Sequence, residues 1–252
     1  VIRRNIDAMA TVKMNVLHLH LTDDEGFRIE SKQFPKLHQA GSDGDYYTQE
    51  EMKGLIQYAL ERGIFIMPEF DLPGHSQSWF AGYPELASAP GPYTPGPRFK
   101  LGNVKSLAEV MTMINTAATP TIDPTRESVY QFMDKFIGEM RGIFPAAYFH
   151  IGADENNGVA WKNNPKIQQF MKKNKIADTR ALEDYFVKRM HAVVSKHKYR
   201  MVVWEEAFTP SLPKDVIVQK WKPEMGMMGG APLTISKVVE AGHDILLSTG
   251  FY

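Results

Sequence analysis

Six short apolar stretches recur along the chain, and each one stops at residues that can carry chemistry. The stretches are rich in Val, Ile, Leu, Met and Phe, which is typical of strands buried on both faces of a sheet. The residues that follow them are carboxylates, His, Trp or Tyr. The stretches are residues 16–21, 64–70, 146–151, 201–203, 216–218 and 245–247. We expect the ends of these strands to form one shared face.

Segments with helical periodicity lie between the apolar stretches. Residues 48–62 begin with Thr48 and Glu51, a pair that fits a capping box, and stop at Gly63. Alternation of helices with almost wholly apolar strands predicts a parallel α/β sheet covered by helices. The other expected helices are residues 128–141, 166–174, 179–196 and 234–241.

Of the parallel folds, the (β/α)8 TIM barrel gathers side chains from many strand ends into one site. A doubly wound open sheet instead builds its site at one switch point, often with a glycine-rich phosphate loop. Neither a G-x-G-x-x-G nor a Walker sequence is present, so the pattern favours the barrel. Because about six strands are recognisable, we expect an incomplete barrel, with one further strand before Val1 and one after Tyr252.

Composition and length add a few constraints. At 252 residues the chain fits a single, partial barrel domain, residues 1–252. Residues 87–124, which begin rich in Pro, Gly and Ala, are expected to form a long loop insertion at the rim of the cleft. The net charge is zero and there is no basic run, which disfavours nucleic acid as a partner. No stretch is long enough for a membrane span, and the absence of cysteine excludes thiol catalysis.

The end of the third apolar stretch carries the densest chemistry. Gly152 is followed two residues later by two adjacent acids, Asp154 and Glu155. Uncompensated neighbouring charges cost free energy, so their presence after a strand indicates a site. Paired carboxylates with separated pKa values are typical of enzymes that cleave glycosides. The alternative interpretation is a helix N-terminus, where the helix dipole favours Asp and Glu.

Five motifs in chain order resemble those of glycoside hydrolase family 20, the β-N-acetylhexosaminidases and chitobiases. They are residues 18–30 (H-L-H-L-T-D-D-E-G-F-R-I-E), 68–76 (P-E-F-D-L-P-G-H-S), 150–155 (H-I-G-A-D-E), 202–206 (V-V-W-E-E) and the terminal 251–252 (F-Y). Two departures from the family pattern stand out. Ala153 replaces a glycine, and Glu25-Gly26-Phe27 replaces Gln-Gly-Trp, which we expect to alter the wall of the cleft.

The resemblance implies an exo-acting enzyme that removes terminal β-linked N-acetylglucosamine or N-acetylgalactosamine by a retaining, substrate-assisted mechanism. The substrate's own 2-acetamido oxygen would be the nucleophile. Glu155 would be the general acid and then the base, and Asp154 would accept the acetamido N–H. Tyr252 would donate its hydroxyl to the acetamido oxygen. No cofactor or metal is expected.

The resemblance also implies supporting residues. Trp204 and Trp221 would wall the sugar pocket, and His75 with Asp23 would form a relay toward Glu155. Asp24 and Glu205 are candidate ligands of sugar hydroxyls. Taken without the resemblance, His75 is more typical of a turn-capping histidine, and Asp23 and Asp24 of loop or cap residues.

Three other interpretations stay open at this point. A metal-dependent hydrolase of the amidohydrolase kind would use His18 and His20 with His75 and His150, although we interpret His18, His20 and His150 mainly as hydrogen-bonded structural residues. A non-catalytic sugar-binding protein and an inactive truncated homologue are the other two. A bacterial periplasmic or secreted location is favoured over a lysosomal one because none of the nine asparagines is an N-x-S/T acceptor. The oligomeric state is left open.

Overall fold

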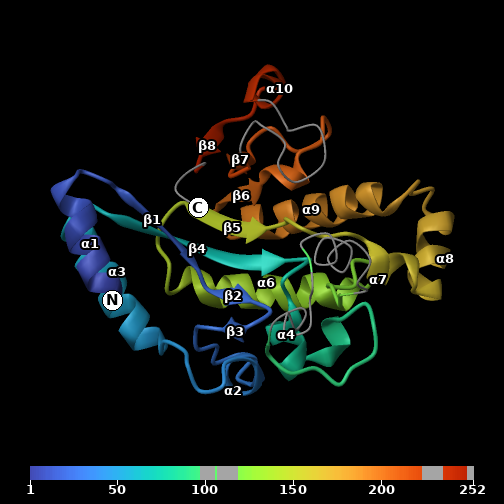
Figure 1. Cartoon of the computed structure of the whole chain (residues 1–252), viewed down its shortest axis with the longest axis horizontal. Coiled ribbons are helices and arrows are strands. Elements are labelled where there is room, and N and C mark those ends of the chain that lie inside the picture. The colour runs from blue at the N-terminus through green and yellow to red at the C-terminus, as the bar shows by residue number, and fades with distance from the viewer. Residues whose placement is uncertain (97–105, 107–118, 223–234, 249–252) are drawn as a thin grey trace.

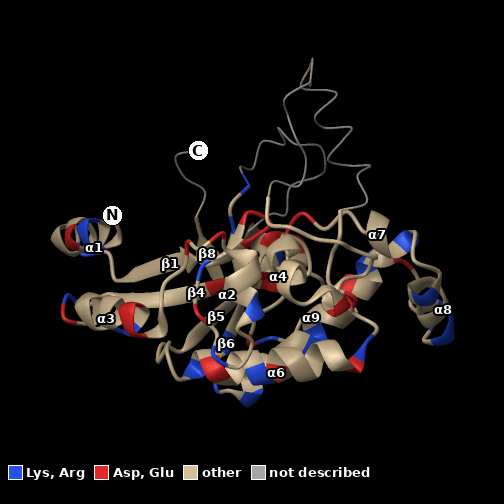
Figure 2. Ribbon diagram, turned by 90° about the horizontal axis from the view of Figure 1, so that it is seen from below, with Lys and Arg blue, Asp and Glu red and all other residues tan. Residues whose placement is uncertain are grey.

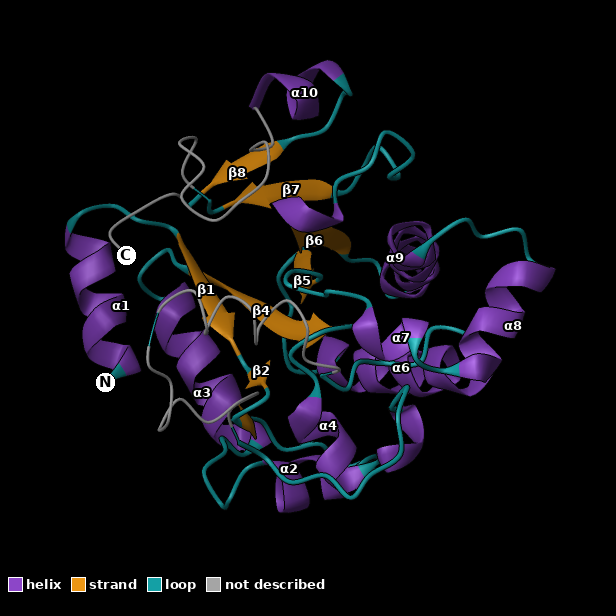
Figure 3. Ribbon diagram, turned by 45° about the vertical axis from the view of Figure 1, so that its right-hand side comes forward, coloured by secondary structure: helices purple, strands orange, loops and turns teal. Residues whose placement is uncertain are grey.

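The computed structural model describes residues 1–96, 106, 119–222 and 235–248. Its centre is a sheet of six parallel strands in the order β1-β4-β5-β6-β7-β8, which curls like part of a barrel with helices on its outer side (Figures 1 and 3). The strands are β1 (Val16–His20), β4 (Phe65–Leu72), β5 (Tyr148–Gly152), β6 (Arg200–Trp204), β7 (Ile217–Lys220) and β8 (Ile245–Leu247). The expected incomplete TIM barrel of about six strands is confirmed.

The helices follow the strands in the expected alternation. They are α1 (Ile2–Thr11), α2 (Lys36–Gly41), α3 (Gln49–Leu60), α4 (Gln77–Gly82), α6 (Glu127–Arg141), α7 (Val159–Lys162), α8 (Pro165–Lys173), α9 (Thr179–Lys196) and α10 (Ile235–Glu240), with short 3-10 turns η1 (Pro84–Leu86) and η3 (Glu205–Ala207). The predicted capping box of α3 is present, because the Thr48 side chain accepts from the Glu51 backbone and the Glu51 carboxylate accepts from the Thr48 backbone. Acidic and basic residues are both present on α1, α3, α6 and α9, whereas α8 carries only basic ones (Figure 2). Among the described residues, no helix is long and apolar enough to cross a membrane.

The main core lies between the helices and the outer face of the sheet. An aromatic group from β3 (Gly26–Phe27), β4, α4 and α6 packs there, with the rings of Phe27 and Trp79 4.9 Å apart, edge to face. Phe27 is fully buried in this core. The expectation that residue 27 alters the wall of the cleft was therefore wrong, because the antiparallel β2–β3 hairpin, β2 being Thr22–Asp23, turns this side chain toward α4 and α6.

The inner face of the sheet changes character along the strands. Side chains alternate between the two faces of a strand, and near the strand starts the inner positions are apolar: Met67, Val202 and Ile217 form a small cluster with Leu246. Two residues further along, the inner positions are Glu69 on β4 and Gln219 on β7, and the inner position on β5 is His150, all of them buried. The polar end of the barrel interior is thus the carboxyl end of the strands, where TIM barrels place their sites.

The segment 87–124 is joined at its base. Ala87 and Ile122 form an isolated antiparallel bridge, and the backbone N–H of Ser88 donates to the Thr121 carbonyl at 2.8 Å. The backbone N–H of Gly96 donates to the Asp24 carbonyl, which brings this segment to the β2–β3 hairpin. Residues 97–105 and 107–118 lie outside the described residues, so the rim function of this loop stays a prediction.

Candidate active site

A left-handed turn at the end of β5 brings the two adjacent acids to one side. Gly152 has φ +70°, Ala153 +71° and Glu155 +47°. A side chain at position 152 is impossible without rearrangement, because its Cβ would lie 1.7 Å from Oδ1 of Asp71. Ala153 adopts a conformation that favours glycine, and its N–H donates to the same Asp71 oxygen at 3.3 Å. The buried Asp71 on β4 therefore shapes the turn that presents Asp154 and Glu155.

Both acids face His75, which follows β4. Nε2 of His75 lies 3.6 Å from Oδ2 of Asp154 and 3.5 Å from Oε2 of Glu155. The Asp154 side chain is 15% exposed, whereas that of Glu155 is 39% exposed. The two neighbouring acids thus have different surroundings. One is held inside the protein, and the other reaches solvent.

Asp23 holds the far side of His75. Its Oδ1 lies 2.9 Å from Nδ1 of the imidazole, and it also accepts from the Asp24 backbone N–H. Burial lowers the pKa of His75, but Asp23 and the other surrounding carboxylates outweigh burial and raise it to about 12. The hydrogen bonds from His20 and His75 likewise outweigh burial and lower the pKa of Asp23. His75 is therefore a cation at neutral pH.

Burial separates Asp154 from an ordinary aspartate. Desolvation raises the pKa of Asp154 to about 6, helped by the negative charges of Glu206 and Glu69 and opposed by His75. Burial and the charge of Asp154 raise the pKa of Asp71 well above its usual value, so Asp71 holds a proton more tightly than an ordinary aspartate does. Oδ1 of Asp154 is buried and, among the described residues, has no hydrogen-bond partner. This oxygen is suited to accept a hydrogen bond from a bound molecule.

Two tryptophans lie at the ends of the next strands. Nε1 of Trp204 donates to Oε1 of Glu69 at 2.8 Å, and its ring lies 4.8 Å from that of His150. Nε1 of Trp221 lies 3.2 Å from both carboxylate oxygens of Glu206. Both rings are partly exposed, so each is oriented by an acid and still presents surface at the strand ends.

Glu205 and Asp24, the two residues predicted to contact sugar hydroxyls, are both hydrogen-bonded within the protein. Glu205 is 5% exposed, and its carboxylate accepts from Nζ of Lys220 at 3.2 Å and from the backbone N–H groups of residues 221 and 222 at 3.1 and 2.7 Å. Asp24 is 3% exposed and accepts from the Gln77 backbone at the start of α4. Their contacts with sugar stay predictions. Tyr252 lies outside the described residues.

Sequence reasoning missed two buried charged residues near the site. Lys220, at the end of β7, is 1% exposed, and its Nζ donates to the carboxylate of Glu205. Glu183 on α9 is 5% exposed and accepts from Nδ2 of Asn156, the residue after Glu155; burial raises its pKa to about 7. The available signal was positional, since Glu183 lies four residues before Val187 and seven before Met190 on the buried face of its helix.

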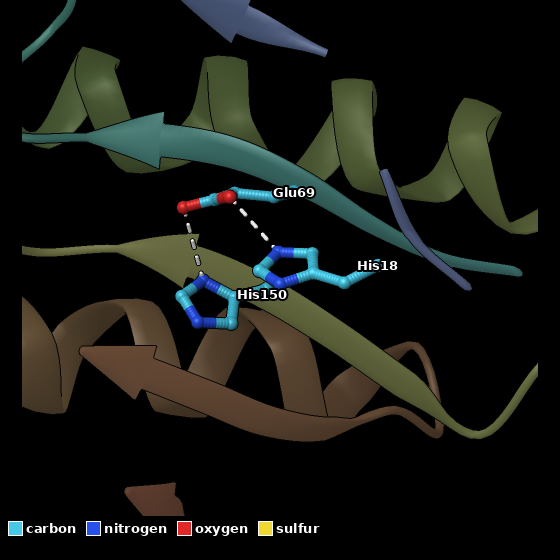
Figure 4. A group of neighbouring side chains, drawn as sticks. All are labelled: His18, Glu69 and His150. Carbon is cyan, nitrogen blue, oxygen red and sulfur yellow. Dashed lines mark ion pairs between the residues drawn. The ribbon is translucent and has the colours of Figure 1, made fainter. Parts of the chain in front are cut away.

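A group of neighbouring side chains in the barrel interior has the composition of a metal site. Nε2 of His18 lies 2.8 Å from Oε2 of Glu69, and Nδ1 of His150 lies 3.3 Å from Oε1 (Figure 4). However, Glu69 also accepts from Trp204 and lies 2.7 Å from Nδ1 of His20, and Nδ1 of His150 accepts from the Gly152 N–H. A cation would have to displace these bonds, so the donor set favours a hydrogen-bonded group over a metal centre.

The strand ends of this curled parallel sheet bring together acids, imidazoles and indoles from successive strands. The chain is therefore one of the TIM-barrel proteins that build their site at the carboxyl ends of the strands. Within that class it belongs to glycosyl hydrolase family 20, because the catalytic-domain model of that family matches residues 1–252.

Individual relatives agree with the family. The chain is 36% identical to β-hexosaminidase subunit alpha of Rattus norvegicus and 33% identical to a β-hexosaminidase of Porphyromonas gingivalis, with 100% and 99% of this chain covered. A chitobiase structure from Flavobacterium johnsoniae matches with a TM-score of 0.84 and 39% identity. The match covers 100% of this chain and 36% of the chitobiase chain. An exo β-N-acetylglucosaminidase of Vibrio harveyi, solved with N-acetylglucosamine, matches with a TM-score of 0.76 and 29% identity over 98% of this chain and 38% of its own. The chain spans 44% of the rat relative and 30% of the P. gingivalis relative.

Proposed function

We propose that this chain carries the reaction centre of an exo-acting, retaining β-N-acetylhexosaminidase that acts on terminal N-acetylglucosamine or N-acetylgalactosamine. The observation that supports this most is the pairing of a buried acceptor on Asp154 with a half-exposed acid on Glu155, both facing the cation of His75. The buried acceptor on Asp154 can accept a hydrogen bond from a substrate N–H. The acid on Glu155, which reaches solvent, can protonate a leaving group.

In the proposed first step the substrate's acetamido oxygen attacks C1. The bond from C1 to the leaving oxygen breaks, and Glu155 gives its proton to that oxygen. The product is a cyclic oxazolinium ion, whose N–H and positive charge face Asp154. Water then attacks C1, the bond from C1 to the acetamido oxygen breaks and restores the acetamido group, and Glu155 takes the proton of that water. The sugar leaves with its configuration retained.

The remaining residues are proposed to bind and orient the sugar. Trp204 and Trp221, fixed by Glu69 and Glu206, would pack against the ring and the acetyl methyl. Tyr252 would donate to the acetamido oxygen and complete its alignment for attack. The relatives named above support a carbohydrate with an N-acetyl group as the substrate class.

The acid role is tested with Glu155→Gln. The variant should lose roughly two to four decades in kcat on a disaccharide of N-acetylglucosamine, the usual scale of general-acid catalysis. The loss should be much smaller on an activated aryl glycoside, whose leaving group needs little protonation. An equal loss on both substrates would remove Glu155 from this role.

Substrate assistance is tested with the wild type. A thiazoline analogue of N-acetylglucosamine should inhibit strongly as a mimic of the cyclic intermediate, and glycosides without the 2-acetamido group should not be cleaved. Trapping a sugar covalently on Asp154 or Glu155 would show an ordinary enzymic nucleophile. A protein that binds the sugar without any turnover would be a sugar-binding homologue.

We also propose a periplasmic or secreted location in a bacterium. The bacterial hexosaminidase among the relatives and the absence of N-x-S/T acceptors support it. Cell fractionation of the native host with an antibody to the chain tests it, and recovery in the cytoplasm would contradict it.

A further inference from the structure

The contacts around His75 continue further into the barrel than the Asp23–His75 pair. Oδ2 of Asp23 lies 3.1 Å from Nε2 of His20, and Nδ1 of His20 lies 2.7 Å from Oε2 of Glu69. The line of contacts then runs from Asp23 to His75 at 2.9 Å. From His75 it reaches Glu155 at 3.5 Å and Asp154 at 3.6 Å. Carboxylates and imidazoles therefore alternate without a break from the barrel interior to the reaction centre.

Each nitrogen of His20 has its own carboxylate. Although the side chain is 42% exposed, these two contacts hold the imidazole ring in one orientation. Asp23 is fixed in the same way, since one of its oxygens faces His20 and the other accepts from the Asp24 N–H and faces His75. Rotation of Asp23 would break contacts on both sides at once.

We propose that His20 and Glu69 are positioning residues of the hydrolytic site, which hold Asp23 in the orientation that keeps His75 against Glu155. This inference rests on the proposed function for its kinetic consequence, although the line of contacts itself does not. His20 acts through Asp23 and His75 and does not touch the substrate.

The charges along the line support this assignment. Burial lowers the pKa of His20, but its bonds to Asp23 and Glu69 outweigh burial and raise it to about 10. The neighbouring histidines, above all His150 and His18, outweigh burial and lower the pKa of Glu69. Two cations thus alternate with anions at neutral pH, so each member is attracted by the next.

Glu69 has a second connection that strengthens the argument. Its other oxygen accepts from Nε1 of Trp204, the residue proposed to pack on the acetyl group. One buried carboxylate therefore orients a wall of the sugar pocket and, through His20, the histidine beside the acid. Such outer partners commonly decide how well a functional group is aligned.

Two substitutions at one position separate the two bonds of His20. The amide of Asn lies where Nδ1 lies, so His20→Asn keeps the contact with Glu69 and loses the contact with Asp23. The amide of Gln reaches the place of Nε2, so His20→Gln keeps the contact with Asp23. The matched control is His18→Asn, because His18 is on the same face of β1 and also pairs with Glu69 but not with Asp23.

The kinetic experiment compares these variants on a disaccharide of N-acetylglucosamine and on its activated aryl glycoside. His20→Asn should lower kcat on the disaccharide roughly 10–100-fold, the scale of such supporting contacts, with little change in KM and a smaller loss on the aryl substrate. His20→Gln should recover part of the activity, because it keeps the contact with Asp23 but not the one with Glu69. His18→Asn should keep the wild-type ratio between the two substrates. Equal losses in His20→Asn and His20→Gln, or the same ratio change in His18→Asn, would overturn the proposal.

A spectroscopic arm does not depend on turnover. The Nδ1 proton of His75, bonded to Asp23, should give a proton resonance far downfield of the amides, assigned by its loss in Asp23→Asn. The resonance should be absent or shifted in His20→Asn and present in His20→Gln and His18→Asn. Its persistence in His20→Asn would refute the positioning role, whereas a wild type without hydrolytic activity but with this pattern would refute only the proposed function.

Discussion

At the scale of one residue, the ionised and buried carboxylate of Asp154 lowers the free energy of unfolding. A carboxylate that is desolvated and faces other acids is less stable ionised than it would be in the unfolded chain. Its raised pKa, about 6, means that the folded protein holds a proton there more tightly than the unfolded chain does. Stability is therefore lost as pH rises from the unfolded value toward the folded value, and the cost is fully present above about pH 6.

Asp154→Asn should consequently stabilise the protein while removing its activity. At pH 7–8 we expect the free energy of unfolding to rise by roughly 1–3 kcal/mol. The gain should shrink as pH falls below 6 and vanish near the ordinary pKa of an aspartate, because the wild-type side chain is then protonated. Thermal denaturation of both proteins across this pH range measures the difference. A gain that does not depend on pH, or a loss at pH 8, would contradict the buried-charge explanation.

Some of these residues were predictable from sequence and others were not. Asp154 and Glu155 were found because they follow an apolar strand, which is a local signal. The role of His75 was predicted only from the resemblance to the family. The raised pKa of Asp71 and the burial of Lys220 arise from neighbours far away in sequence. The identity of a charged residue does not indicate that it is buried, because the residue that pairs with it is brought into contact only by the fold.

At the scale of elements, the strand ends were the most predictable part of the molecule. All six strands and the helices α3, α6, α8, α9 and α10 lie within a few residues of their predicted positions, because apolar runs, caps and glycines mark them locally. The β2–β3 hairpin was not predicted, and it decides where Phe27 and Asp23 point. Two-residue strands carry too little periodicity to be recognised.

The junction between β6 and β7 depends on a buried ion pair. Lys220 and Glu205 are 1% and 4% exposed at their side chains, so removing one charge leaves the other desolvated and unpaired. Glu205→Gln should destabilise the protein by about 3–5 kcal/mol, and the double variant Glu205→Gln with Lys220→Met should recover much of this loss. Urea unfolding of the single and double variants measures both.

The more exposed pair Lys222–Glu206, 36% and 18% exposed, provides the control. Lys222→Met should cost less than about 1 kcal/mol, as surface pairs do. A Glu205→Gln variant of wild-type stability with a raised KM would instead support the predicted contact between Glu205 and sugar.

At the scale of the whole molecule, the sheet of described residues has two edges. β1 pairs only with β4, and β8 only with β7, so each leaves backbone groups of one side without a strand partner among the described residues. Apolar side chains accompany them, with Val16 39% and Leu247 57% exposed. Unpaired edges with apolar surface are templates for association.

We therefore expect residues 1–252, produced as a separate chain, to self-associate through these edges. Sedimentation velocity over a range of concentrations should show oligomers, and Leu247→Lys should reduce them because a charge on an edge strand opposes pairing. Val239→Lys is the matched control, since Val239 is 54% exposed but lies on α10. If the chain is a monomer at all concentrations, or if both lysine variants act alike, association is not driven by the open edges.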